Sequence, residues 1–144
     1  MFTRLLIGLD GSPNADEALK QAIVLGRRFK SRLIVAHVKE THGLGRRASD
    51  SGELLQRAQE RVANAGLAVD TVLRHGSPDS ELAALAGDVD TVFVGRRGRS
   101  SSRADVVGKT VSSLIRIAER SVVVCASKPS PMQRCAMCWP AGKR

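Results

Sequence analysis

Short apolar runs alternate with amphipathic stretches along most of the chain. The apolar runs are rich in Leu, Ile and Val, and they cover residues 4–9, 32–38, 67–73, 91–94 and 121–126. Runs of this length that are apolar almost throughout are typical of strands buried on both faces of a parallel sheet. The pattern therefore predicts five parallel strands.

Between consecutive strands, apolar residues recur at helical spacing. The clearest case is residues 14–29, where Ala15, Ala18, Leu19 and Ala22 share one face. The other predicted helices cover residues 53–65, 78–86 and 109–119, and residues 40–52 are predicted to be a polar, glycine-bearing loop. A Ser-Pro pair precedes both the first and the third helix, which is a signal for a helix start.

Strict alternation of strands and helices predicts an α/β domain over residues 1–127. Right-handed crossovers would place the strands in one open five-stranded parallel sheet with helices on both faces. Residues 128–144 contain three prolines, several basic residues and no periodic pattern. We therefore predict that they form a Pro-rich basic tail outside the domain.

The chain is strongly basic, with a formal net charge of +9 over 144 residues. Such a charge suggests that the protein could bind nucleic acid. The arginines, however, are spread along the sequence, and aromatic residues make up only 3% of it. A surface on which bases stack is therefore not expected. No apolar run approaches the roughly 20 residues that span a bilayer. The N-terminus lacks the pattern of a signal peptide. We expect a cytoplasmic protein with neither a membrane nor a nucleic acid as its partner.

The three cysteines predict no disulfide framework, because their number is odd and no secretion signal precedes them. Cys125 falls in the last predicted strand and is most simply a core residue. Cys135 and Cys138 form a single C-x-x-C in the tail, without the second pair that a structural zinc site requires. Reactive surface thiols are favoured there over a metal or redox site.

Candidate chemistry gathers where the strands of such a sheet would end. In open parallel sheets, ligands bind beyond the carboxyl ends of the strands, at the point where the strand order reverses. Three segments would meet at that edge: the turn at Asp10, the end of the second strand at Val38, and the long loop over residues 95–110. This edge is therefore the predicted binding site.

The long loop has the composition of a phosphate site. Gly95 and Gly98 allow the backbone to approach a ligand closely. Gly108, Lys109 and Thr110 stand where the last helix begins, and the N-terminus of a helix favours an anion. The loop also carries five cations, a charge that suits two or three phosphates: Arg96, Arg97, Arg99, Arg103 and Lys109. The alternative is a solvated basic loop without a ligand.

Two common phosphate motifs do not fit. The sequence from Gly108 to Thr110 looks like the end of a P-loop, but the position of the required earlier glycine holds Arg103. The turn after the first strand lacks G-x-G-x-x-G, so Rossmann-type binding of NAD is not expected.

The pattern as a whole resembles the universal stress protein family. The nucleotide loop of that family reads Gly, two residues, Gly, nine residues, Gly and then Ser or Thr; Gly95, Gly98 and Gly108 have this spacing. LLIGLDGSPNADEAL resembles the first strand and helix of the family, and VGKTVSSLIRIAERSVVV resembles its last helix and strand. The resemblance covers about residues 2–126.

This resemblance implies an ATP-binding site, a fold and a dimer. The fold is the adenine nucleotide alpha hydrolase-like sheet of order 3-2-1-4-5, and the dimer pairs residues 121–126 with their twin. In the implied site, Asp10 lies near the nucleoside and Val38 meets the adenine through its backbone. The remaining site residues contact the ribose and phosphates or add charge: Gly95, Arg97, Gly98, Gly108, Lys109 and Thr110.

One departure from the family bears on this site. Lys109 stands where the family has Ser or Thr, and the hydroxyl is displaced to Thr110, which puts a Mg²⁺ contact in doubt. Asp105 is the only acidic residue inside the loop, so any ATP hydrolysis is expected to be slow. Two interpretations remain: an ATP-binding regulatory protein of the stress response, or a dimeric interaction protein that binds no nucleotide. An ATP-using enzyme ranks behind both.

Overall fold

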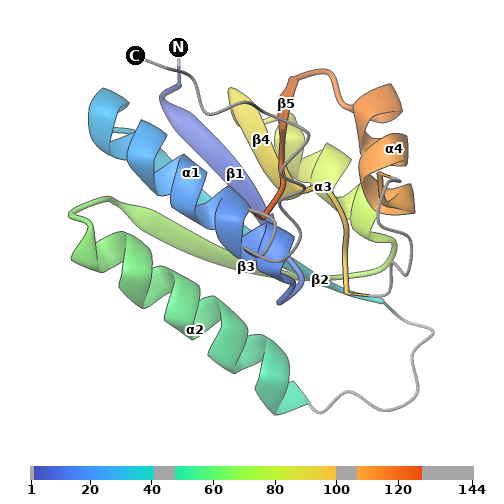
Figure 1. Cartoon of the computed structure of the whole chain (residues 1–144), viewed down its shortest axis with the longest axis horizontal. Coiled ribbons are helices and arrows are strands. Elements are labelled where there is room, and N and C mark those ends of the chain that lie inside the picture. The colour runs from blue at the N-terminus through green and yellow to red at the C-terminus, as the bar shows by residue number, and fades with distance from the viewer. Residues whose placement is uncertain (1, 41–47, 100–106, 128–144) are drawn as a thin grey trace, which may run out of the picture.

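The computed structural model describes residues 2–40, 48–99 and 107–127, and these ranges contain five strands and four helices in strict alternation. Figure 1 shows one sheet flanked by helices. The elements in chain order are β1 (Arg4–Leu9), α1 (Pro13–Phe29), β2 (Arg32–Lys39), α2 (Ala48–Asn64), β3 (Val69–His75), α3 (Pro78–Ala86), β4 (Thr91–Gly95), α4 (Lys109–Ile117) and β5 (Ser121–Cys125). The predicted tail lies outside the described residues.

All neighbouring strands pair in parallel, and their order in the sheet is β3-β2-β1-β4-β5. Ile7 in the middle of β1 pairs with Val35 on one side and with Phe93 on the other. The order confirms the prediction. The chain adds β2 and β3 on one side of β1 and then crosses over to add β4 and β5 on its other side. The reversal point therefore lies between the carboxyl ends of β1 and β4.

The side chains of alternate residues of β1 pack into two separate hydrophobic cores, one on each face of the sheet. Leu5 and Ile7 point to the face covered by α1 and α2, whereas Leu6 points to the face covered by α3 and α4. All three side chains are fully buried. The central strand is therefore covered on both faces, as its unbroken apolar sequence predicts.

The second helix begins earlier than the sequence predicted. We expected a loop over residues 40–52, but α2 already begins at Ala48 and passes through Gly52. Ser51 is buried on the same helical stripe as Leu55 and Ala58, so burial against the sheet outweighs the low helix propensity of Gly52. The prediction of a loop up to residue 52 was wrong for this reason.

Two further elements have boundaries that differ from the prediction by two residues. β3 runs over Val69–His75 instead of 67–73, because it follows β2 in register from Leu33 to Lys39. It lies at the edge of the sheet with none of its residues fully buried, so its apolar pattern is a weak guide to its ends. At the other edge, α4 ends at Ile117, two residues before the predicted end.

Candidate functional site

The carboxyl ends of β4 and β5 and the two described ends of the glycine loop are joined by backbone hydrogen bonds. The Arg96 N–H donates to the carbonyl of Cys125 over 2.7 Å, which continues the β4–β5 ladder by one residue. The Gly108 N–H donates to the carbonyl of Arg96 over 2.9 Å. The two described ends of the loop, 95–99 and 107–110, are thereby held side by side at the reversal point.

Asp10 follows β1 and connects two turns through its carboxylate. Its Oδ1 accepts the Ser12 N–H over 2.9 Å, and its Oδ2 accepts the Arg99 N–H over 3.1 Å. The first bond is the turn-capping role that aspartate often plays before a helix. The second reaches across 89 positions of sequence, so Asp10 also fixes the start of the glycine loop.

Two glycines of the loop are required by close approaches inside the protein. A Cβ on Gly95 would lie 2.6 Å from the Ala15 nitrogen and 2.7 Å from the Asn14 carbonyl carbon. A Cβ on Gly98 would lie 2.8 Å from Oδ2 of Asp10. No side chain fits at such distances without movement of its surroundings, so both glycines let the loop pack directly on the first turn and on α1.

The N-terminus of α1 is closed by the protein's own side chains. The Ser12 hydroxyl oxygen accepts the Ala15 N–H over 3.1 Å, and this hydroxyl donates to the Arg97 carbonyl over 3.3 Å. The side-chain amide of Asn14 donates to the same carbonyl over 3.3 Å. Arg97 itself is half-buried, and its backbone faces α1. The N-terminus of α1 is therefore capped and hydrogen-bonded from within the protein.

The N-terminus of α4, in contrast, has a residue without a side chain as its cap. Gly108 precedes the helix with φ −60° and ψ 153°, and as a glycine it supplies no side-chain cap to the first turn. The first N–H groups of an α-helix have no partner inside the helix, and they carry the positive end of its dipole. Lys109 is exposed and Thr110 is half-buried. A position for Cβ on Gly108 lies 3.5 Å from Cα of Arg97, so the open helix end adjoins the glycine turn.

Val38 lies at the same edge, near the end of the neighbouring strand. His37 pairs with Leu9 in the β1–β2 register, and Val38 is the next residue along β2. His37 is 8% exposed, and its Nδ1 lies 2.7 Å from the Leu9 carbonyl oxygen. This histidine is engaged in holding β2 against β1, as expected of a structural residue.

Sequence reasoning missed the residue that fixes the position of α4. Oδ2 of Asp79, in the first turn of α3, accepts the Ser113 hydroxyl of α4 over 2.5 Å, and the Ser77 hydroxyl donates to Oδ1. The hydrogen bond from Ser113, followed by that from Ser77, holds the pKa of Asp79 below its usual value. The only signal was the Ser-Pro-Asp helix start, which does not reveal a partner 34 residues away.

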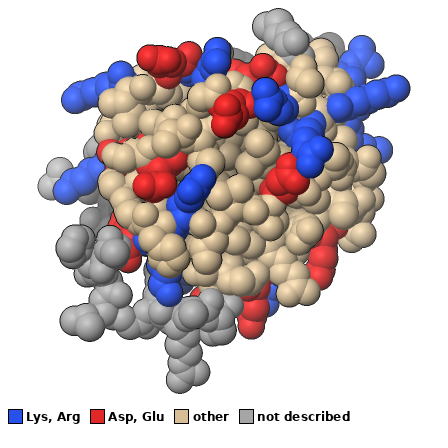
Figure 2. Space-filling model, turned by 180° about the vertical axis from the view of Figure 1, so that it is seen from behind, with Lys and Arg blue, Asp and Glu red and all other residues tan. Residues whose placement is uncertain are grey.

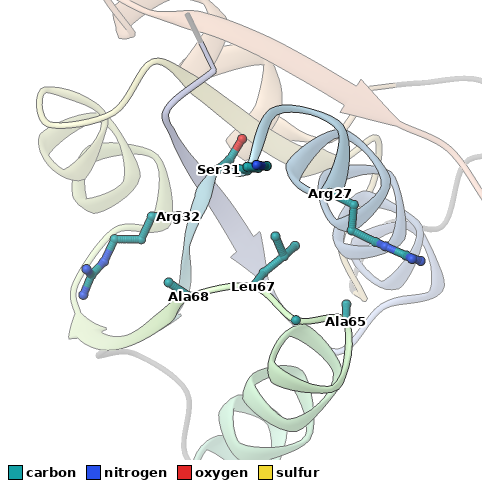
Figure 3. A pocket seen from close by; sticks show the side chains of 8 residues that line it. Arg27, Ser31, Arg32, Ala65, Leu67 and Ala68 are labelled. Carbon is teal, nitrogen blue, oxygen red and sulfur yellow. The ribbon is translucent and has the colours of Figure 1, made fainter.

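The described residues also line two open hollows, one at the amino edge of the sheet and one along β5. One of about 450 Å³ lies at the amino edge, between the end of α1 and the α2–β3 turn (Figure 3). The side chains of Arg27 and Arg32 point away from one another there, and Arg32 is paired with Asp70 over 2.6 Å. The other hollow, of about 500 Å³, lies beside β5 and is lined by apolar residues that include Val24, Val123 and Val124.

Neither the distribution of charge nor the placement of metal-ligating residues points to a second binding site within the described ranges. Figure 2 shows acidic side chains between the basic ones on the face opposite that of Figure 1, so the cations do not form an unbroken stripe there. Within the described ranges, no group of three His, Cys, Asp or Glu residues could hold a metal ion, and no helix is long and apolar enough to cross a membrane. Cys125 is buried, and burial raises the pKa of its thiol. Cys135 and Cys138 lie outside the described residues.

Solved structures share this fold. The universal stress protein UspA from Lactobacillus plantarum superposes with a TM-score of 0.78 and 20% identity, over 86% of this chain and 97% of that one. A universal stress protein solved in complex with cAMP superposes with a TM-score of 0.70 and 21% identity, over 88% of this chain and 98% of that one. The universal stress protein from Archaeoglobus fulgidus in complex with dAMP superposes with a TM-score of 0.68 and 18% identity, over 87% of this chain and 99% of that one.

Sequence comparison leads to the same group of proteins. A Staphylococcus haemolyticus protein, provisionally named as a universal stress protein, is 27% identical over 146 residues that cover 90% of this chain and 88% of the relative. A similarly named Staphylococcus epidermidis protein is 28% identical, over 90% of this chain and 87% of the relative. The family model described as "Universal stress protein family" matches residues 1–126. Together with the strand order and the glycine loop at its reversal point, this match shows that the chain belongs to the universal stress protein family.

Proposed function

We propose that this protein binds ATP at the reversal point of its sheet and acts as a small cytoplasmic regulatory protein of the stress response. One observation carries the proposal: the N-termini of α1 and α4 flank the glycine turn at this edge, and whereas α1 is capped by the Ser12 side chain, the cap residue of α4 is a glycine. An uncapped helix N-terminus beside a glycine turn is a site for phosphate. The universal stress proteins solved with cAMP and dAMP support an adenine nucleotide as the ligand.

In the proposed arrangement, the backbone carries most of the contacts. The N–H groups of Lys109 and Thr110 face the phosphates at the start of α4, and the glycine turn around Gly98 leaves room beside them. The Asp10 turn and the backbone of Val38 lie on the nucleoside side of the same edge. Basic side chains, with Arg97 and Lys109 among them, supply charge.

Lys109 changes the chemistry of the phosphate contact without removing it. Any residue type supplies the backbone N–H at this position, and the lysine ammonium adds a point charge. The hydroxyl of Thr110 lies about 100° further around the helix than one at position 109, so it cannot replace the missing group atom for atom. Mg²⁺ is therefore proposed to arrive with the phosphates and to depend little on this chain.

The site offers little for hydrolysis. Asp10 is the acidic residue nearest to the described loop, and both of its carboxylate oxygens already accept backbone N–H groups. A general base needs to reach the attacking water within hydrogen-bond distance. We therefore expect slow turnover at most, which suits a protein that responds to occupancy.

A second copy of the chain is the proposed partner at β5. Among the described strands, β5 lies at an edge of the sheet, so one row of its backbone groups pairs with no other described strand; Val123 and Val124 are each 37% exposed. Unpaired edges of this kind invite pairing with another strand. The adjoining hollow, lined by Phe2, Val24 and β5, would receive apolar side chains from the twin. The proposed homodimer pairs residues 121–126 of the two copies.

Calorimetric titration of the purified chain with ATP, with and without Mg²⁺, tests the proposal. Gly98→Asp places a second carboxylate where a Cβ already meets Asp10, and it should abolish binding. Gly87→Asp is the matched control, because a Cβ on Gly87 meets its nearest atom at an ordinary 3.6 Å at the far end of α3. If the unaltered chain gives no heat at ATP concentrations near 1 mM, the proposal is contradicted. A dissociation constant of about 1 mM corresponds to a binding free energy of about −4 kcal/mol.

The alternative function, a dimeric interaction protein without nucleotide, is favoured by Lys109 alone. Its signature in the same experiments is a protein that sediments as a dimer yet shows neither heat nor a change in melting temperature with ATP.

A further inference from the structure

Asn14 lies in the first turn of α1, between two segments that are distant in sequence. Its Nδ2 donates to the carbonyl of Arg97, in the glycine turn, over 3.3 Å. Its Oδ1 accepts the backbone N–H of Ser127 over 2.8 Å and the Ser127 hydroxyl over 3.1 Å. Ser127 is two residues beyond the end of β5. One side chain thus joins the candidate nucleotide loop to the end of the edge strand.

The orientation of this amide is fixed by its partners. A backbone carbonyl can only accept a hydrogen bond and a backbone N–H can only donate one, so the amide oxygen must face Ser127 and the nitrogen must face Arg97. Aspartate at position 14 would keep the acceptor and lose the donor. Alanine would lose both. The two halves of the junction can therefore be separated by substitution.

The surroundings of Asn14 leave little room for independent movement of the two segments. Gly95 packs on the same turn so closely that a Cβ would lie 2.9 Å from the Asn14 Cβ. The Arg96 N–H to Cys125 carbonyl bond runs beside the junction. A displacement of the glycine turn relative to the end of β5 would break one of the Asn14 hydrogen bonds. Contiguous hydrogen-bonded contacts of this kind are able to carry coupling between sites.

We propose that Asn14 is a positioning residue that couples occupancy of the nucleotide loop to the end of β5. The inference rests on the proposed function. Phosphates that settle on the open end of α4 fix the glycine turn, the Arg97 carbonyl holds the Asn14 amide, and the amide oxygen shields the Ser127 N–H. Because linkage is reciprocal, a second copy bound at β5 changes the affinity for nucleotide by the same factor.

Hydrogen exchange at the Ser127 amide, resolved by NMR on the full chain, measures this coupling directly. Saturating ATP, set for each variant by calorimetry, should slow the exchange roughly tenfold in the unaltered chain. Asn14→Asp should keep the slow basal exchange and lose the response to ATP, because only the contact with Arg97 is removed. Asn14→Ala should accelerate the basal exchange and also lose the response. Asn64→Ala, at an exposed asparagine that ends α2, should respond like the unaltered chain.

The outcomes separate the inference from the function on which it rests. If the unaltered chain binds no ATP, both fail. If it binds ATP while Ser127 exchange is unchanged, or if Asn14→Asp responds as the unaltered chain does, the inference alone is overturned. A purely structural role is distinguished by the melting temperature of Asn14→Asp. An acidic residue in the first turn favours the helix, so the response should vanish without a loss of stability.

Discussion

The N-termini of α1 and α4 begin at the same edge of the sheet and are treated in opposite ways. Ser12 caps α1 with its hydroxyl, whereas Gly108 offers α4 no side chain. The α1 end also receives the glycine turn through Arg97 and packs against Gly95, so it serves the fold. At α4, the N-terminal backbone N–H groups are the ones that the proposed function assigns to the phosphates. Under the proposed function, the same helix geometry would have two uses, and the side chain of the cap residue would decide between them.

The largest expected effect comes from closing the space between β4 and α1. Gly95→Ala would put a Cβ 2.6 Å from the backbone nitrogen of Ala15, which cannot move aside as a flexible side chain would. Overpacking of this kind costs about 1–3 kcal/mol of unfolding free energy. Urea denaturation should measure this loss, and ATP affinity should fall as well because the glycine turn shifts.

Gly87→Ala is the matched control for this substitution. Gly87 has φ −56° and ψ −31°, and a Cβ there meets only the Ala84 carbonyl, at 3.6 Å. Stability should be unchanged or slightly higher because the unfolded chain loses freedom. Equal losses in the two variants would show that Gly95 is not a packing glycine.

The sequence predicted the fold, but it did not predict which glycines are required by close packing inside the protein. The periodicity of apolar residues located every strand and helix, because each element has its own local pattern. The strand order came from the resemblance to the family, which itself was recognised from local motifs. The packing of Gly95 on Asn14 and the bond between Asp79 and Ser113 join residues far apart in the chain. No local pattern encodes such contacts. Gly52 misled for the same reason, since burial of the neighbouring Ser51 kept the helix intact.

Removal of the α1 cap should cost less than the closure at Gly95. Ser12→Ala leaves the Ala15 N–H without its side-chain acceptor, and loss of such a cap costs about 1 kcal/mol. The Arg97 carbonyl keeps Asn14 as a donor, so ATP affinity should fall only a few-fold. Thermal unfolding together with ATP titration checks both effects. Ser80→Ala, at an exposed serine on α3, should change neither quantity; a Ser12 variant as stable as that control would contradict the capping role.

The position of α4 should depend on pH through Asp79. Hydrogen bonds from Ser113 and Ser77 lower its pKa in the folded state from the ordinary 3.8. A lowered carboxylate pKa stabilises the fold above the unfolded pKa, and the stabilisation is lost as the pH falls through the folded pKa. Unfolding free energies of the unaltered chain and Asp79→Asn should therefore differ at neutral pH and converge on acidification below 3.8. A difference that stays constant down to the lowest pH would exclude this linkage.

The smallest effect on stability, and the sharpest test of the comparison, comes from giving α4 the cap that α1 has. Gly108→Ser fits the backbone, since φ is −60° and a Cβ would lie 3.5 Å from its nearest neighbour. The new hydroxyl should stabilise the helix by only about a few tenths of a kcal/mol. It would also occupy an N–H group that the phosphates are proposed to use, so ATP binding should weaken while the melting temperature rises slightly. Serine at this position with undiminished ATP affinity would mean that the open end of α4 is not the phosphate site.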